Sequence, residues 1–186
     1  MDWTFLLIDA LPLLAFAVVD SLGTTRKAVA AALALAGLAT AYDLYLFGRP
    51  DEFSLISLGL IVLFGGLALK YDNPVYFKFK PAVLSAVSAV VLLGTWWLDS
   101  PLLVGALDRY ADLVPPPLQA QTRTPLFRQI MALATLYLGL GFALHAAAVA
   151  WAALRLGTWG WFFTRLVGGY AVLFGSVLLA ASHLRG

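Results

Sequence analysis

The sequence alternates long apolar segments with short polar connections. Six segments approach the roughly 20 apolar residues that a helix needs to cross the hydrocarbon core of a bilayer. None shows the alternation of a barrel strand, and lipid cannot satisfy free backbone amides, so the pattern predicts membrane-spanning helices. The predicted spans cover residues 5–22, 28–47, 53–69, 81–98, 126–154 and 162–184. The first is the weakest, because Asp9, Pro12 and Asp20 interrupt it.

One connection, residues 99–125, has a pattern of its own. Ser100 and Pro101 favour a helix start, with a hydroxyl cap followed by proline in the first turn. Apolar residues then recur on one face up to the prolines at 115–117, which we expect to end the helix. The pattern predicts a short amphipathic helix that either lies on the membrane surface or packs on the bundle as an ordinary loop helix.

The composition is that of a membrane protein. Of the 186 residues, 62% are hydrophobic and 12% are charged, whereas an ordinary soluble domain is about 25% charged. We therefore expect an all-α transmembrane helical bundle that forms one integral membrane domain, residues 1–186. The acidic N-terminus lacks the basic start of a signal peptide, so the first segment is expected to stay in the mature protein. A net charge of +2 gives no reason to expect nucleic-acid binding.

The residue types of common catalytic and metal sites do not cluster in the sequence. The chain has no cysteine, and its two histidines, His145 and His183, lack the spacing of metal ligands. No nucleophile–base pair, P-loop or dinucleotide-binding fingerprint can be assembled. We therefore predict that the protein is not an enzyme and has no catalytic residues, metal or cofactor.

Several ionisable residues lie in or near the apolar segments, where charge is costly and indicates function by default. Asp9 lies close to Pro12, which frees a backbone carbonyl, and is predicted to make an interior polar contact. Asp20 and Asp43 lie near span ends and are expected to reach interfacial water. His145 lies within the fifth span and is expected to be neutral and hydrogen-bonded across helices; the alternative is a haem or quinone site.

Glycines in the apolar segments predict close helix packing, because small residues let backbones approach one another in lipid. The leading example is Phe64-Gly65-Gly66 in the third span, and the alternative there is a thinned spot that admits a lipid or substrate. The same interpretation applies to Gly139, Gly141, Gly168 and Gly169. The run at residues 62–69 is similar to that at 172–179. The similarity indicates either an inverted repeat, as in some carriers, or only the shared composition of glycine-rich apolar helices.

A turn rich in lysine and aromatic residues joins the third and fourth spans. Asn73-Pro74 is a turn signal, and the lysines after it alternate with aromatics, so an extended entry would place them on one side. Such cations reach lipid phosphates; the alternative is an ordinary basic loop. The predicted headgroup- or partner-binding residues are Lys70, Asp72, Phe77, Lys78 and Lys80. An aromatic belt at span ends is predicted for Tyr71, Tyr76, Trp96, Trp97, Trp159 and Trp161.

Basic residues suggest an orientation for the chain. The odd-numbered loops carry more lysine and arginine than the even-numbered ones. Because cytoplasmic loops are enriched in these residues, we expect the odd-numbered loops in the cytoplasm and both termini outside.

The order of these motifs over residues 5–107 resembles the intracellular septation protein A family, also called YciB-type inner-membrane proteins. Those proteins carry a Phe-Gly-Gly-Leu-Thr-Leu run, an acidic turn and a Phe-x-Lys-x-Lys signature at the same relative spacing. The matching positions here are Phe64, Gly65, Gly66, Leu67, Leu69, Asp72, Phe77, Lys78, Lys80 and Pro81. Beyond residue 108 the match is thin, and GFALHAAAVAW at 141–151 replaces the family's Asn-bearing span.

The resemblance implies a non-enzymatic, multi-pass protein of the bacterial inner membrane. It would serve envelope integrity, elongation and septation through contacts with lipids and other inner-membrane proteins. Two further functions stay open. One is a small accessory subunit of a larger respiratory or photosynthetic complex; the other is a carrier of lipids or small hydrophobic molecules, with a polar cavity near Asp9 and His145.

Overall fold

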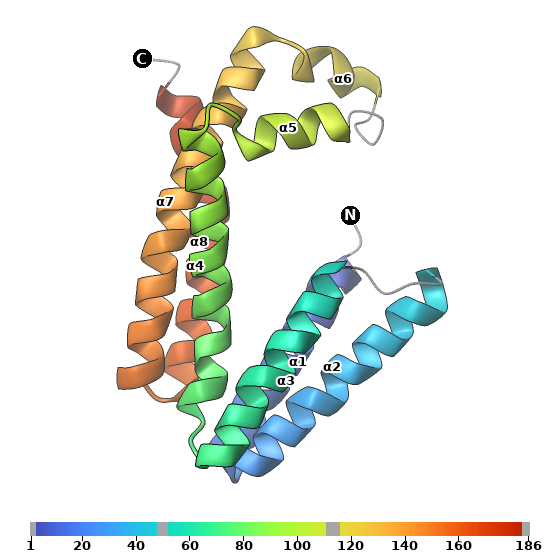
Figure 1. Cartoon of the computed structure of the whole chain (residues 1–186), viewed down its shortest axis with the longest axis vertical. Helices are drawn as coiled ribbons and strands as arrows, with labels where there is room; N and C mark the ends of the chain where they lie inside the picture. The colour runs from blue at the N-terminus through green and yellow to red at the C-terminus, as the bar shows by residue number, and fades with distance from the viewer. Residues whose placement is uncertain (1–2, 48–51, 111–115, 184–186) are drawn as a thin grey trace. The chain divides into compact units, whose positions relative to one another are not determined.

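A computed structural model describes residues 3–47, 52–110 and 116–183. Within the helices, the side chains of residues 3–12, 39, 43, 46–47, 52–54, 56–57 and 116–118 lie outside this description. The described residues form helices and no strand (Figure 1). The predicted all-α fold is therefore confirmed.

Six long helices coincide with the six predicted spans. They are α1 (Trp3–Leu22), α2 (Thr25–Phe47), α3 (Glu52–Tyr71), α4 (Val75–Trp97), α7 (Pro125–Arg155) and α8 (Thr158–His183). Among the described residues, α4, α7 and α8 are long and apolar enough to cross a membrane, and α1 and α3 contain shorter apolar stretches, Leu13–Leu22 and Leu58–Tyr71. The fold is that of an all-α membrane protein, and the number of crossings stays a prediction.

The chain folds as two compact units. The first consists of Met1–Pro81 and Val149–Thr164, and the second of Ala82–Ala148 and Arg165–Gly186. Helices α4, α7 and α8 therefore each contribute to both units. The predicted single domain over residues 1–186 stays a prediction.

In the first unit, α1 packs against α2 and α2 against α3 (Figure 1). The buried face of α2 is built from small residues, Ala28, Val29, Ala32 and Ala36. These positions are spaced by one, three and four residues, so they share one face of the helix. Their small side chains allow close approach of the neighbouring helices, which is how helices associate where lipid removes the hydrophobic driving force.

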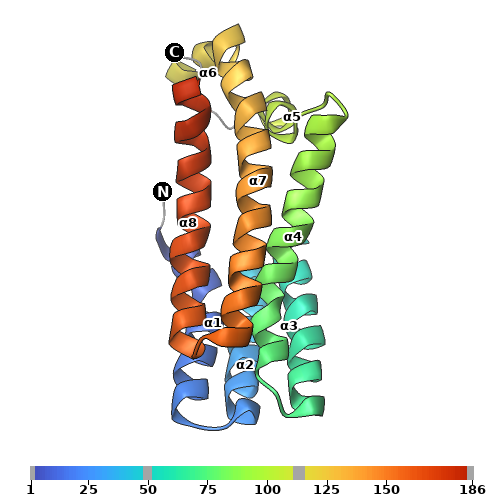
Figure 2. The same ribbon diagram turned by 90° about the vertical axis from the view of Figure 1, so that its left-hand side faces the viewer.

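In the second unit, α4, α7 and α8 run side by side (Figure 2). Two glycines of α7 make the contacts close: a Cβ atom on Gly139 would lie 2.8 Å from Leu93 of α4, and one on Gly141 would lie 2.8 Å from Val172 of α8. Real Cβ atoms essentially never approach a neighbour that closely. The predicted packing role of these two glycines is confirmed.

Two short helices, α5 (Leu102–Arg109) and α6 (Pro116–Thr122), form the connection between α4 and α7. The residue before α5 is Pro101 and no side chain caps the helix, so the predicted Ser100 cap is wrong. The helix also ends at Arg109, before the prolines. Pro116 instead begins α6, because the first turn of a helix has no partner for the N–H that proline lacks.

The short helix α5 is attached to α7. The backbone N–H of Leu103 donates to Thr135 Oγ1 at 3.3 Å, and Arg128 donates two hydrogen bonds of 2.8 Å to the Asp108 carboxylate. No residue of α5 is buried. The attachment fits the loop-helix alternative and leaves membrane-surface contact a prediction.

Candidate functional site

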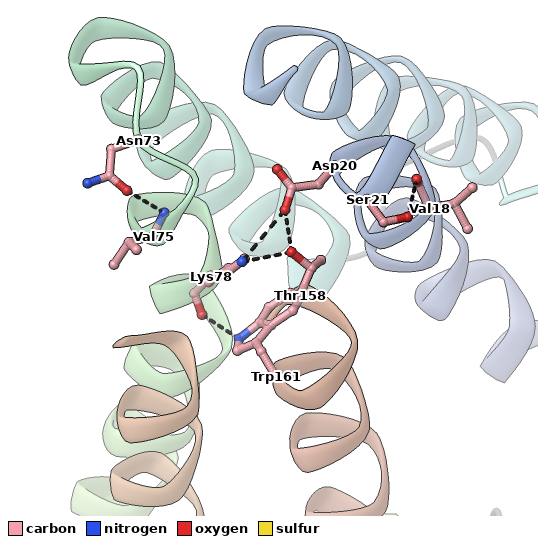
Figure 3. Close-up of polar contacts among 8 residues, drawn as sticks. All are labelled: Val18, Asp20, Ser21, Asn73, Val75, Lys78, Thr158 and Trp161. Atoms are coloured by element: carbon pink, nitrogen blue, oxygen red, sulfur yellow. Dashed lines mark hydrogen bonds and ion pairs between the residues drawn. The ribbon is translucent and has the colours of Figure 1, made fainter. Parts of the chain in front are cut away.

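Three helix ends of the first unit bring a carboxylate, an ammonium and a hydroxyl group together (Figure 3). Asp20 lies near the C-terminus of α1, Lys78 in the first turn of α4, and Thr158 begins α8. Thr158 Oγ1 donates to Asp20 Oδ2 at 2.5 Å and accepts from Lys78 Nζ at 2.9 Å. Lys78 Nζ lies 3.6 Å from the same carboxylate oxygen. We call Asp20, Lys78 and Thr158 the polar lock.

The polar lock is buried. The side chains of Lys78 and Asp20 are 7% and 8% exposed. Taking either ion out of water alone would cost several kcal/mol or more, so buried charges persist where they are paired and hydrogen-bonded. The lock supplies both conditions and connects α1, α4 and α8.

Helix dipoles support the pairing. Asp20 lies near the C-terminal end of its own helix and Lys78 near the N-terminal end of its own, and each position disfavours the charge it carries. In the lock, the carboxylate instead faces the N-terminal ends of α4 and α8, and the ammonium faces the C-terminal end of α1. Each charge thus finds a favourable dipole on a neighbouring helix.

An aromatic cluster lies beside the lock. Phe16 of α1 stacks on Phe77 of α4 with ring centroids 4.2 Å apart, and Trp161 of α8 meets Phe16 edge-on at 5.9 Å. All three side chains are fully buried. Because they are apolar and exclude water, they strengthen the electrostatic interactions next to them.

Trp161 also supports α4 where a proline interrupts it. Pro81 lies inside α4 and lacks the N–H that would bond the carbonyl of Phe77, four residues earlier. The indole N–H of Trp161 donates to the adjacent carbonyl, that of Lys78, at 2.9 Å (Figure 3). Helix α8 is therefore tied to this turn of α4 by the Lys78 backbone as well as by its side chain.

The entry to α4 is helical, and the predicted extended entry is wrong. Asn73 Oδ1 accepts a hydrogen bond of 2.9 Å from the N–H of Val75 (Figure 3), so the predicted turn residue acts as the helix cap. Asp72 precedes it with a left-handed φ of 48°. Since α4 begins at Val75, Lys78 and Lys80 are about 200° apart around the helix and point in different directions.

The predicted binding of lipid headgroups by Lys78 and Lys80 is corrected, because both side chains are buried. Lys78 and Lys80 are only 6% and 5% exposed, and Lys78 is bound within the lock. Phe77 belongs to the aromatic cluster. Lys70 and Asp72 are exposed at the turn, so a headgroup or partner contact stays a prediction for these two.

Sequence reasoning missed most partners of Lys78. Asp20 was expected to reach interfacial water and Trp161 to join the aromatic belt, and both expectations are wrong because the two side chains are buried. Thr158 and Phe16 gave no sequence signal. One signal was available: Asp20 and Lys78 carry opposite charges beside apolar segments, where ionisable groups usually pair.

The three residues of the Phe64-Gly65-Gly66 motif have different surroundings in the structure. A Cβ atom on Gly65 would lie 3.1 Å from Val29 of α2, whereas Gly66 is exposed and has no described neighbour within 4 Å. Phe64 is half-buried. Adjacent helix residues are about 100° apart, so only Gly65 faces α2. The prediction that Gly66 also packs closely against another helix is wrong for the residues that the structure describes.

The proposed internal repeat does not place equivalent residues alike. Gly175, the counterpart of Gly65, has no described neighbour within 4 Å. Ser176, the counterpart of the exposed Gly66, is buried. The two runs therefore differ in packing role at these positions, and an inverted repeat stays a prediction.

A second polar network lies in the second unit, around His145 of α7. Its Nδ1 is 3.1 Å from Ser85 Oγ of α4, and its Nε2 is 3.2 Å from the Arg165 carbonyl oxygen of α8. A carbonyl only accepts, so Nε2 carries a proton. In the neutral ring that the sequence predicts, Nδ1 is then the acceptor for the Ser85 hydroxyl. The expected cross-helix hydrogen bonds are thus present. Ligation of haem iron by either nitrogen would first break one of them.

Asp9, the other predicted intramembrane polar residue, belongs to α1, but its side chain lies outside the described residues, as does that of Asp43. The predicted interior contact of Asp9 stays a prediction. The cavity that a carrier would need near Asp9 and His145 also stays a prediction.

The polar lock combines a hydroxyl group, a carboxylate and an ammonium, and each of the three is bound by another member of the lock. The Thr158 hydroxyl donates its only proton to Asp20, and its oxygen accepts from Lys78. The described residues contain no group of histidine and acidic side chains that could hold a metal ion, and none of their buried side-chain polar atoms lacks a hydrogen bond.

Comparisons with known proteins agree on one family. The family model described as intracellular septation protein A matches residues 5–174. An inner membrane-spanning protein YciB from Methylobacillus flagellatus is 31% identical over 163 residues, which are 87% of this chain and 90% of the relative. The protein of the same name from Photorhabdus laumondii is 32% identical over 135 residues, 70% of this chain and 75% of the relative.

Coverage differs among the relatives. For the inner membrane-spanning protein YciB of Cronobacter sakazakii, 32% identity extends over 108 residues, 58% of this chain and 61% of the relative. No solved structure matches the chain significantly.

Proposed function

Because the chain belongs to the intracellular septation protein A family, we propose that it is a non-enzymatic scaffold of the bacterial inner membrane. In this proposal it serves envelope integrity, elongation and septation through contacts with lipids and other membrane proteins. The relatives are named inner membrane-spanning proteins, and this chain has helices able to cross a membrane.

The observation that carries the proposal is the use made of Lys78. This residue lies in the Phe-x-Lys-x-Lys signature, where a binding or catalytic group would be looked for. Its ammonium is instead bound by Asp20 and Thr158, and its carbonyl by Trp161. The signature thus holds three helix ends together, which supports a role in building a stable surface over a role in chemistry.

A triple substitution tests this role in cells. In the bacterium that carries this chain, the gene is deleted and supplied again as wild type, as Lys78→Met or as Asp20→Leu/Lys78→Met/Thr158→Val. We expect deletion to alter cell length and septum placement and the wild type to restore both. The triple variant should also restore them, because apolar residues of similar volume can replace a buried ion pair without loss of stability.

Two outcomes would contradict the proposal. Cell length and septum placement unchanged by deletion would remove the septation role. A triple variant that reaches the membrane in normal amount and still fails to restore division would give the lock residues a chemical or binding role. Lys78→Met alone is the matched comparison, because it leaves the Asp20 carboxylate buried and unpaired.

A second candidate, an accessory subunit of a larger complex, is favoured by the surface of α8. Only 11% of the 18-residue apolar stretch of α8 is buried within the chain, against 44% for that of α4. The exposed side chains are large and include Phe174, Leu178 and Leu179. Stoichiometric co-purification of another membrane protein, lost on Phe174→Ala, would favour this candidate; a chain that purifies alone from native membranes would not.

A further inference from the structure

Three chain turns gather at one end of the first unit. Asp20, Lys78 and Thr158 contact one another, and each lies within a few residues of a different turn. These turns connect α1 to α2, α3 to α4, and α7 to α8. The polar lock therefore holds the three turns close together.

Exposed basic side chains border these turns. Two follow the first turn at the start of α2, one lies in the last turn of α3 and one ends α7. They are Arg26, Lys27, Lys70 and Arg155, which we call the basic rim. Among the described side chains of the same turns, Asp72 is the only exposed acidic one. The end of the first unit that carries the turns is therefore positively charged at its surface, although the lock beneath it is neutral overall.

Aromatic residues at the same turns indicate the depth of the rim. Tyr71 and Tyr76 are exposed and stack at 5.1 Å, Lys70 Nζ lies 5.4 Å from the Tyr71 ring centroid, and Trp159 is exposed beside the α7–α8 turn. Exposed tyrosine and tryptophan at helix ends concentrate at the membrane–water interface. Aromatic residues of this kind beside the rim support a position at the level of the lipid phosphates.

From this arrangement we propose that the basic rim binds the phosphates of anionic phospholipids. The inference rests on the proposed inner-membrane role and assigns its lipid contact to residues other than Lys78 and Lys80. An anionic bilayer surface complements the four charges, and it is continuous with the lipid around the same helices. The turns that carry the rim are also the odd-numbered loops, which the sequence predicts in the cytoplasm, where anionic lipids attract basic residues.

The test measures lipid affinity of the full chain directly. Protein in detergent is titrated with phosphatidylglycerol, with phosphatidylcholine as the neutral comparison, and bound lipid is counted by native mass spectrometry. Each basic residue near an anionic surface is worth about 1 kcal/mol, a factor of about five in affinity. We expect Arg26→Gln/Lys27→Gln and Lys70→Gln/Arg155→Gln each to weaken phosphatidylglycerol binding by an order of magnitude or more, with little change for phosphatidylcholine.

The matched control is Arg109→Gln/Arg123→Gln, which removes two exposed arginines from the connection between α4 and α7. It should leave phosphatidylglycerol binding unchanged. Equal losses in control and rim variants, or no loss in the rim variants, would overturn the proposal. Wild-type binding should also weaken as salt is raised, and binding insensitive to salt would overturn it without any variant.

This result is independent of the division assay. A chain that fails to restore division but prefers phosphatidylglycerol through the rim keeps the lipid site and loses the proposed function. A chain that restores division without any lipid preference does the reverse.

Discussion

The two polar networks use different chemistry to hold helices together. In the first unit, the polar lock joins three helix ends with a buried ammonium and carboxylate. In the second unit, His145 joins α4 and α8 with hydrogen bonds from one ring. Both networks are closed, because every buried side-chain polar atom in the described residues has a partner.

The two networks therefore differ in how much stability is lost when one partner is removed. A buried ion left alone keeps its full desolvation cost, so the lock depends on all its members. A neutral side chain left alone loses a hydrogen bond, which is worth less. The histidine network instead depends on space, since a Cβ atom on Gly168 would lie 2.9 Å from His145 Cδ2.

The largest effect should follow from breaking the lock. Lys78→Met removes the ammonium and leaves Asp20 buried and unpaired. We expect a loss of about 3–5 kcal/mol in the free energy of unfolding, the usual cost of breaking one side of a buried pair. Thermal unfolding of the detergent-solubilised protein measures it.

The control for this prediction is Asp20→Leu/Lys78→Met/Thr158→Val, which removes all three polar groups. It should recover most of the lost stability, since no charge is left without a partner. A triple variant as unstable as Lys78→Met would show that the lock contributes by its specific bonds and not by avoiding an orphaned charge.

The next effect concerns the space beside His145. In Gly168→Ala the new methyl group must displace the imidazole ring, and forced overpacking of this kind costs about 1–3 kcal/mol. Gly175→Ala on the same helix is the matched control, because a Cβ atom there meets nothing within 4 Å. Equal melting temperatures for the two variants would mean that the ring does not need the glycine.

The sequence predicted the helices well because hydrophobic segment length is a local property. Six spans agree with six helices to within a few residues at most ends. The largest error was the start of α4, placed at Pro81 rather than at Val75. The prolines and lysines there are typical of a connection between helices. The support that α8 gives to this turn through Trp161 is a tertiary contact, which no local sequence pattern contains.

The candidate site was predicted only in part. Lys78 and Phe77 were predicted as site residues, but at a lipid-binding surface, because a lysine between aromatics at a span end ordinarily reaches lipid phosphates. The burial of Lys78 depends on Asp20 and Thr158, which lie 58 and 80 residues away along the chain. Pairing of opposite charges between segments requires knowing which helix ends meet, and one sequence does not contain that information. For His145 the cross-helix bonding was predictable, and the partners were not.

A smaller effect should separate the hydrogen bond of His145 from its packing. Ser85→Ala removes the hydroxyl group that contacts Nδ1 and leaves the ring volume unchanged. Cross-helix hydrogen bonds in membrane proteins are worth about 0.6 kcal/mol on average and up to ~1.7 kcal/mol, so the loss in unfolding free energy should fall in this range. The control is Ser88→Ala, three residues further along α4. A loss as large as that of Lys78→Met would remove the distinction between the charged and the neutral network.

The smallest effect extends the comparison to an ion pair that is exposed. Arg128 donates two hydrogen bonds of 2.8 Å to Asp108, and these bonds lower the pKa of that carboxyl group below its ordinary value. A lowered folded-state pKa means that the contribution is complete above the ordinary carboxyl pKa of about 4 and is lost as the pH falls through the lower value. Solvent screens the pair, so it should matter for the attachment of α5 and little for global unfolding.

Hydrogen exchange of the α5 amides should therefore be faster in Asp108→Asn than in wild type at neutral pH, once the rates are corrected for the intrinsic effect of pH. The two proteins should become alike in acid, below the lowered pKa, and a difference that persisted there would mean that α5 is held by Asp108 in some way other than through its charge.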